Sequence, residues 1–317
     1  MESKDKITVS QLPKTSQPQI TTETHQEKGW KFIFKKSGIL PSKELDQICD
    51  ELNLQGIPDV VYGNNVALLI NEDHNIVYEI SPQDSLSFCN FSKQKENFKE
   101  TFDTTPDIDS ITVIPTELKI KQAEFWKHKK VSEDADIKVL EKISDWTYST
   151  PYKGSIKKIK TTKIEEDLKD GIEKLSISSE SKIYLAKTDE EIPLNNLTAS
   201  NPIKWFSEFL LFEDELGDCG LSQSTFRFRA MGDCFFGLLR SYLRVDDVCV
   251  RIYDTRIYHE FGKNYILREF STRENTFDEL KKKGFKFDSE FITNHRQSDI
   301  VYQSLDLKSV FRDKVIF

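Results

Sequence analysis

Short segments in which apolar and polar residues alternate recur along the chain, and this period of two predicts β-strands. The first such segment is 30–34, and a later one is 226–231. The apolar runs 66–70 and 76–80 lie on either side of the polar turn NEDHN. Two apolar runs around a short polar turn predict an antiparallel hairpin.

A second, longer hairpin is predicted in the C-terminal half. The β-rich runs 235–245 and 248–260 lie on either side of Asp246-Asp247, and 265–270 predicts one further strand. Each hairpin predicts antiparallel pairing of its two strands.

Helical spacing predicts a smaller number of helices. One begins with Ser42 as its N-cap and has apolar residues at three- and four-residue intervals up to position 52. A second is predicted from the N-cap Asn201 into FEDELGD (212–218), and a third around 277–283.

Composition adds polar segments to this picture. Charged residues make up 31% of the 317 residues, above the usual fraction of about 25%, while 22 phenylalanines supply apolar surface for a core. Residues 1–28 have almost no large apolar side chains, which predicts a disordered tail. The charged stretches near 91–143 and 157–182 predict insertions, the first with a strand at 111–114 and a helix near 132–143.

Several classes of protein are excluded by simple counts. No segment approaches the roughly 18 consecutive apolar residues of a membrane span, and the polar start of the sequence has no apolar signal-peptide region. The net charge of −8 does not favour nucleic acid. The 5 cysteines are widely spaced and the 5 histidines are not paired, so we expect no disulfides, metal or cofactor. A cytoplasmic protein, or one also present in the nucleus, fits these counts.

Motifs of the common catalytic sites are missing from the sequence. There is no glycine-rich phosphate loop, no GxSxG and no HExxH. Cys234 or Cys249 with His259 is the one pair that a cysteine–histidine hydrolase would use. Free cysteines are usually buried as small apolar groups, and this interpretation is favoured. The residues alone therefore do not indicate a catalytic site.

The segment 251–260, RIYDTRIYHE, combines arginine, tyrosine and aspartate in an alternating strand. One interpretation is a solvated strand face with ion pairs among Arg251, Asp254 and Arg256. The other is a binding rim, in which Arg251, Tyr253 and Arg256 anchor a partner and Asp254 accepts a hydrogen bond. The residues alone leave both interpretations open.

Five segments carry a resemblance to a known family. They are Gly29-Trp30, DELNLQGIPDVVYGNNV (50–66), DWTYSTPYKG (145–154), WFSEFLLFEDEL (205–216) and SYLRVDDVCVRIYDTRIYHEFGKNYILREFSTRE (241–274). They resemble the TIPRL (TIP-forty-one-like) family of regulators in the TOR signalling pathway, its fungal members in particular. The resemblance covers 29–317, which we expect to form one domain.

The resemblance implies an α+β fold of mainly antiparallel sheets with helices packed on the outside. It implies a non-enzymatic protein that binds the catalytic subunit of type 2A serine/threonine phosphatases and the phosphatase-associated regulatory protein of the TOR pathway. The family's phosphatase-binding residues correspond here to Asp84, Ile192, Ile252 and Asp254, with Arg251, Tyr253 and Arg256 as a supporting rim.

An alternative within the same family gives the tail and insertions the main role. The chain would then act chiefly through the phosphatase-associated protein, controlled by phosphorylation at sites such as Thr15, Ser16, Ser178 and Ser179.

Overall fold

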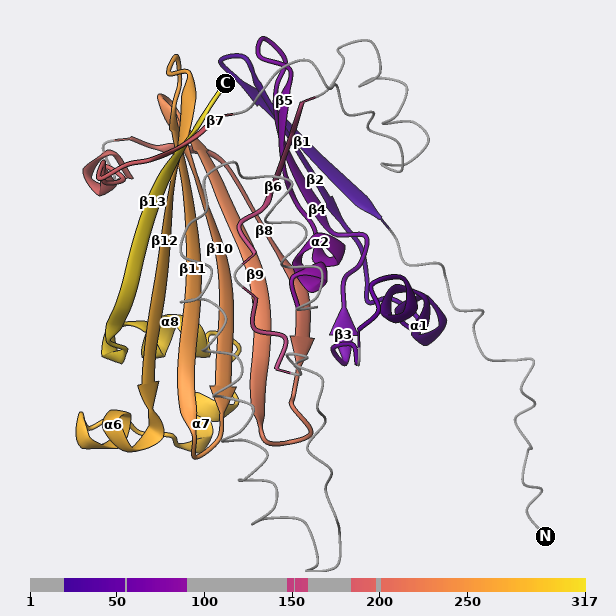
Figure 1. The fold of residues 1–317 in the computed structure, drawn as a ribbon, viewed down its shortest axis with the longest axis vertical. Coiled ribbons are helices and arrows are strands. Elements are labelled where there is room, and N and C mark those ends of the chain that lie inside the picture. Colours follow the sequence, from indigo (N-terminus) through magenta and orange to yellow (C-terminus); the bar gives the residue numbers. More distant parts are fainter. Residues whose placement is uncertain (1–19, 55, 90–146, 151, 159–183, 198–200) are drawn as a thin grey trace, which may run out of the picture.

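A computed structural model describes residues 20–54, 56–89, 147–150, 152–158, 184–197 and 201–317. Two antiparallel sheets pack against each other (Figure 1). The five-stranded sheet has the order β1 (Thr21–Glu27), β2 (Trp30–Lys36), β4 (Val66–Asn71), β5 (Ile76–Ile80) and β6 (Ser155–Lys158).

The larger sheet has eight strands. Their order is β3 (Val60–Val61), β8 (Ile203–Asp214), β9 (Gly220–Met231), β10 (Cys234–Val245), β11 (Cys249–Glu260), β12 (Tyr265–Thr276), β13 (Leu307–Ile316) and β7 (Tyr184–Lys187). The helices are α1 (Ser42–Glu51), α2 (Pro82–Ser87), α6 (Phe277–Lys282), α7 (Ser289–Ile292) and α8 (Gln297–Val301), with 3₁₀ turns η4 (Leu194–Leu197) and η5 (Tyr302–Ser304). This is the expected α+β class.

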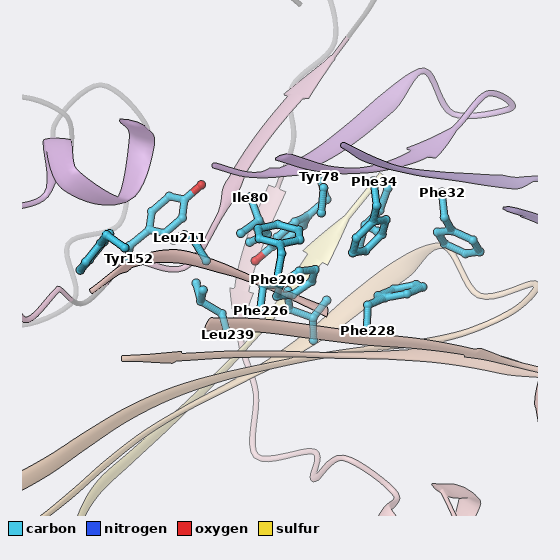
Figure 2. Packing of buried hydrophobic residues seen from close by; sticks show 14 of the residues in the cluster. Phe32, Phe34, Tyr78, Ile80, Tyr152, Phe209, Leu211, Phe226, Phe228 and Leu239 are labelled. Carbon is cyan, nitrogen blue, oxygen red and sulfur yellow. The ribbon is translucent and has the colours of Figure 1, made fainter. Parts of the chain in front are cut away.

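The two sheets share one aromatic core. Phe32 and Phe34 of β2 pack on Phe226 and Phe228 of β9, with ring centroids 4.8 Å apart for Phe32 and Phe228 (Figure 2). We call the side of the eight-stranded sheet that faces this core the inner face. The opposite side, the outer face, is covered at one end by α6, α7 and α8 (Figure 1).

Both predicted hairpins are confirmed. Strands β4 and β5 pair from Ala67↔Ile80 to Asn71↔Ile76, and β10 and β11 pair over their full length up to Val245↔Cys249. The helix predicted around 277–283 is also present as α6, which begins with a capping box at Thr276.

The helix predicted from Asn201 is wrong, because this segment forms strand β8. The side chain of Asn201 accepts a hydrogen bond from the backbone N–H of Gly232, 3.2 Å away, and does not cap a helix. Backbone pairing with β9 continues from Ile203↔Met231 to Asp214↔Ser222. Trp205, Phe209 and Leu211 lie on the side of the strand that faces the core.

Three smaller expectations also need correction. Part of the expected tail forms strand β1, whose polar side chains make ion pairs such as Glu23 with Lys36 at 2.9 Å. The helix α1 starts at Ser42, but its N-cap is Pro41 and no side-chain cap bond forms. Residues 307–316, where the sequence pattern indicates only weak, short elements, form the ten-residue strand β13.

Other predictions concern parts of the chain outside the described residues. These are 1–19 of the tail, the strand and helix predicted within 91–143, and most of the insertion at 157–182. Within the described part of the chain, no helix is long and apolar enough to cross a membrane.

Candidate functional site

Strand β11 divides the predicted site residues between the two faces of the sheet. Side chains alternate along a strand, so Ile252, Asp254 and Arg256 point to the outer face. Arg251 and Tyr253 point to the inner face. The interpretation of 251–256 as one continuous rim therefore does not describe the structure.

Asp254 forms an internal ion pair. Its carboxylate is 1% exposed and accepts hydrogen bonds from Nε and Nη2 of Arg240, both 2.7 Å long. Arg240 also donates to Asp299 of α8 at 2.9 Å and lies over the ring of Tyr302. This bidentate pairing holds the carboxylate in the protein interior, beneath α8.

The other predicted ion pairs also have different partners. Arg251 pairs with Glu274, and Arg256 donates to Glu269 at 2.9 Å. Ion pairs therefore occur on this strand, as one interpretation expected, but they join β11 to its neighbours and do not link Arg251, Asp254 and Arg256 to one another.

Ile252 is also part of the protein interior. It is 1% exposed and packs with Tyr242 and Val250 of the sheet against Phe277 and Leu280 of α6. The side chain therefore anchors the C-terminal helices to the outer face.

Ile192 lies at the other end of the outer face. It is 5% exposed and packs with Met231, Cys234 and Tyr258. Tyr258 lies six residues after Ile252 on β11, which corresponds to about 20 Å along a strand. Ile192 and Ile252 therefore belong to separate clusters.

Asp84 lies near the inner face, on helix α2. The Ser81 side chain caps this helix by accepting a hydrogen bond from the Asp84 N–H at 3.3 Å. The half-buried Asp84 carboxylate accepts a hydrogen bond from Ser155 Oγ at 2.8 Å. The structure thus places Asp84 and Asp254 on opposite sides of the eight-stranded sheet.

Helix α2 and the inner face meet around a narrow polar recess that has no room for a water molecule. Of its eight lining residues, seven carry hydroxyl groups, including Ser85, Tyr152, Ser224, Ser241, Tyr253 and Thr255. Of the residues predicted for the site, Tyr253 lines this recess, and Asp84 lies beside Ser85. We call this the hydroxyl recess.

Tyr152 forms one end of the hydroxyl recess, next to the aromatic core (Figure 2). Its phenol donates to the carbonyl of Glu79 at 3.2 Å, and its own carbonyl accepts from Thr255 Oγ1 at 3.4 Å. Sequence reasoning missed these hydroxyl groups because they come from β9, β10, β11, α2 and the separate residues Thr150 and Tyr152. The alternating Ser222 and Ser224 are the one local signal.

A lysine lies close to the hydroxyl recess. The Lys153 ammonium lies over the rings of Phe270 and Phe311, at 3.9 and 4.9 Å from their centroids. Burial lowers the pKa of Lys153 to about 8, because the charged form loses hydration. Phe270 pairs with Thr255 across β12 and β11, so this charge is at the level of the recess.

The cysteine–histidine pair is not assembled. Cys234 points to the outer face and His259 to the inner face, while Cys249 lies ten residues from His259 on the same strand. Burial also raises the pKa of the Cys234 thiol to about 12, which disfavours the nucleophilic thiolate. Among the described residues, no group of three or more potential ligands could hold a metal ion.

Comparison with known proteins identifies the family. The model of the TIP41-like family matches residues 60–281. A human TIP41-like protein is 32% identical over 251 residues, covering 79% of this chain and 76% of the relative. A Dictyostelium discoideum TIP41-like protein is 32% identical over 288 residues, covering 90% of each chain.

A yeast relative carries a functional name. The Saccharomyces cerevisiae protein named type 2A phosphatase activator TIP41 is 30% identical over 295 residues, which cover 90% of this chain and 67% of that protein. These matches confirm the resemblance seen in the sequence, and the chain belongs to the TIP41-like family.

Proposed function

We propose that this chain is a non-enzymatic regulator that binds the catalytic subunit of a type 2A serine/threonine phosphatase and modulates its activity. The observation that carries this proposal is the relationship over 90% of the chain to a yeast protein named type 2A phosphatase activator. A second relative, from Schizosaccharomyces pombe, has the same name and is 25% identical over 80% of the chain.

The finer part of the proposal places the chain in TOR signalling in the cytoplasm. There it would also bind the phosphatase-associated regulatory protein. Binding measurements with two purified partners test the main proposal and the finer one separately. The phosphatase subunit tests the main proposal, and the associated protein tests the finer one.

For the contact surface we propose the α2 side of the hydroxyl recess. Of the four residues implied by the family resemblance, Ile192, Ile252 and Asp254 are buried, whereas Asp84 is half-buried. A carboxylate at the edge of a recess can accept hydrogen bonds from a partner without disturbing the core. The other three residues lie on the opposite face of the eight-stranded sheet and would act on binding through the stability of the fold.

The test is a binding titration of the purified phosphatase catalytic subunit with Asp84→Asn. This change removes the charge but keeps an oxygen acceptor for Ser155. We expect affinity to fall about fivefold, since a charge at the edge of an interface contributes modestly. Asp278→Asn is the matched control, because Asp278 is exposed on α6, which packs on the outer face.

Phosphatase activity on a phosphopeptide, measured with and without the wild-type chain, completes this test. A change in rate supports regulation. Undetectable binding of the wild-type chain would contradict the proposed function, and wild-type affinity in Asp84→Asn would exclude α2 from the interface.

A further inference from the structure

Residues 188–197 lie on the outer face of the eight-stranded sheet without belonging to it. The segment follows β7 directly and includes η4. Among the described residues, its one backbone bond to a strand is at its start, where the Thr188 N–H donates to the Arg312 carbonyl at 3.1 Å. Beyond Thr188, the contacts that hold the segment on the sheet involve side chains. We call residues 188–197 the strap.

A single apolar side chain anchors the middle of the strap. Ile192 is 5% exposed and packs into a group of buried residues that we call the socket: Met231, Cys234, Tyr258 and Leu267. By contrast, Leu194 is 55% exposed, and no residue of η4 is buried. The apolar attachment of the strap therefore depends mainly on Ile192.

Two ion pairs hold the part of the strap that precedes Ile192. Glu190 pairs with Lys314 and accepts a hydrogen bond from the Tyr265 phenol at 2.9 Å. Glu191 pairs with Arg312 at 3.0 Å. The two glutamate side chains are 44% and 75% exposed. Ion pairs this exposed contribute little to stability, and salt screens them.

Neutral hydrogen bonds hold the part of the strap that follows Ile192. The Asn196 side-chain amide donates to the Tyr258 hydroxyl at 3.1 Å, and the Asn196 carbonyl accepts from the Asn201 side chain at 3.1 Å. Weak polar contacts at both ends and one buried side chain at the centre are typical of a segment that opens locally, before the whole protein unfolds.

The socket is one end of a row of side chains across the outer face. In the strand register, Tyr258 lies between Leu267 of β12 and Phe236 of β10. Phe236 pairs with Arg229 of β9, which pairs with Phe206 of β8. Phe206 is 51% exposed, so the far end of this row is already open to solvent. Release of the strap extends the exposed apolar surface along the row.

We propose that the strap is a reversible cover of the socket, with Ile192 as its anchor and the ion pairs of Glu190 and Glu191 as a salt-sensitive support. The strap opens while both sheets stay folded, and each opening exposes the socket. This device belongs to the isolated chain, so its test does not depend on phosphatase binding.

The thiol of Cys234 reports the opening, because it is 0% exposed in the socket. The full chain is treated with N-ethylmaleimide, and peptide mass spectrometry gives the labelling rate at each cysteine. Cys249 is 3% exposed in a separate cluster at the opposite end of β11, so it reports unfolding of the sheet. We expect labelling of Cys234 to be at least about tenfold faster than labelling of Cys249. Equal rates would overturn the proposal.

A matched pair of variants separates opening of the strap from unfolding of the protein. Ile192→Val removes one methylene from the anchor and should raise the Cys234 rate about fivefold. Ile80→Val makes the same change in the core between the sheets, where Ile80 is 0% exposed. It should raise the Cys249 rate about fivefold and leave the Cys234 rate unchanged, because the core stays packed when the strap opens.

The opposite results are equally clear. If Ile80→Val accelerates labelling of Cys234 as much as labelling of Cys249, the socket is exposed only by unfolding of the protein. A wild-type Cys234 rate in Ile192→Val would mean that Ile192 does not anchor the strap. Either result contradicts the proposal.

A charge variant tests the salt-sensitive support. Glu190→Gln keeps an oxygen acceptor for Tyr265 but removes the ion pair with Lys314. At about 0.05 M NaCl its Cys234 rate should be about threefold above that of the wild type, and at about 0.5 M NaCl the two rates should converge, since salt screens the pair. Identical rates at low salt would contradict the role of this ion pair.

Discussion

Asp254, which is predicted to contact a partner, has a buried carboxylate that also stabilises the fold. It is buried with Arg240, whose guanidinium also bonds Asp299 and lies over Tyr302. Removing one member of a buried pair leaves the other charge without compensation, which is costly. If a change at Asp254 abolished function, lower stability of the fold would therefore be the first explanation, ahead of a lost contact with a partner.

We predict that Asp254→Asn lowers the free energy of unfolding by about 3 kcal/mol, since the amide offers Arg240 one acceptor oxygen but no charge, and its NH₂ group meets the second guanidinium donor. Asp299→Asn is the control. The Asp299 side chain is 37% exposed, so its change should cost at most about 1 kcal/mol. Urea unfolding measures both values. Equal, small losses in the two variants would contradict the buried-pair interpretation.

At the scale of secondary-structure elements, the sequence predicts hairpins better than strands whose partners lie far away in the chain. In the hairpins β4–β5 and β10–β11, alternating strand residues flank a short turn. The residues that specify each hairpin are therefore neighbours in the sequence. Strand β8 was misassigned because Ile203, Phe206 and Leu210 match a helical spacing. Pairing with β9, which local sequence does not encode, decides the outcome. Strand β1 is stabilised by ion pairs and hydrogen bonds to residues far from it in the sequence. The polar composition of this segment, which predicted disorder, does not reveal these partners.

The turn before β6 gives a prediction at this scale. Gly154 has φ of +81°, and a Cβ there would lie 2.3 Å from a ring carbon of Tyr78. Gly154→Ala combines backbone strain with a clash in the core, and we expect a loss of about 3 kcal/mol. Gly262 has φ of +90° with no atom within 4 Å of a Cβ, so Gly262→Ala should lose about 1 kcal/mol. Similar losses in both variants would show that the contact with Tyr78 is unimportant.

For the whole molecule, the site depends on how two sheets meet. The sequence indicates which residues alternate on β11, but the partner of each face follows from long-range packing. Ile252 and Asp254 face the C-terminal helices, whereas Tyr253 faces α2, which comes from a segment about 170 residues earlier in the chain. The family resemblance gives residues on both faces of the sheet. The hydroxyl recess cannot be predicted from it, because the recess forms only where α2 packs over the sheet.

The junction of the two sheets also predicts how stability depends on pH. Trp30 of β2 donates its indole N–H to Nε2 of His259 at 3.0 Å, and His259 Nδ1–H donates to the Tyr265 carbonyl at 2.8 Å. These partners require a neutral ring, and burial lowers the pKa of His259 to about 4. The unfolded chain, with a pKa near 6.5, binds more protons between these values.

Stability from His259 is therefore fully present above pH about 6.5 and is lost as pH falls toward about 4, by roughly 3 kcal/mol in total. His259→Gln removes the titration, while an amide can still accept from Trp30 and donate to Tyr265. We expect the wild-type protein to lose about 3 kcal/mol more than His259→Gln over this interval in urea unfolding at stepped pH. Parallel pH profiles would mean that the two sheets do not depend on a neutral His259, since all other titrating groups are common to both proteins.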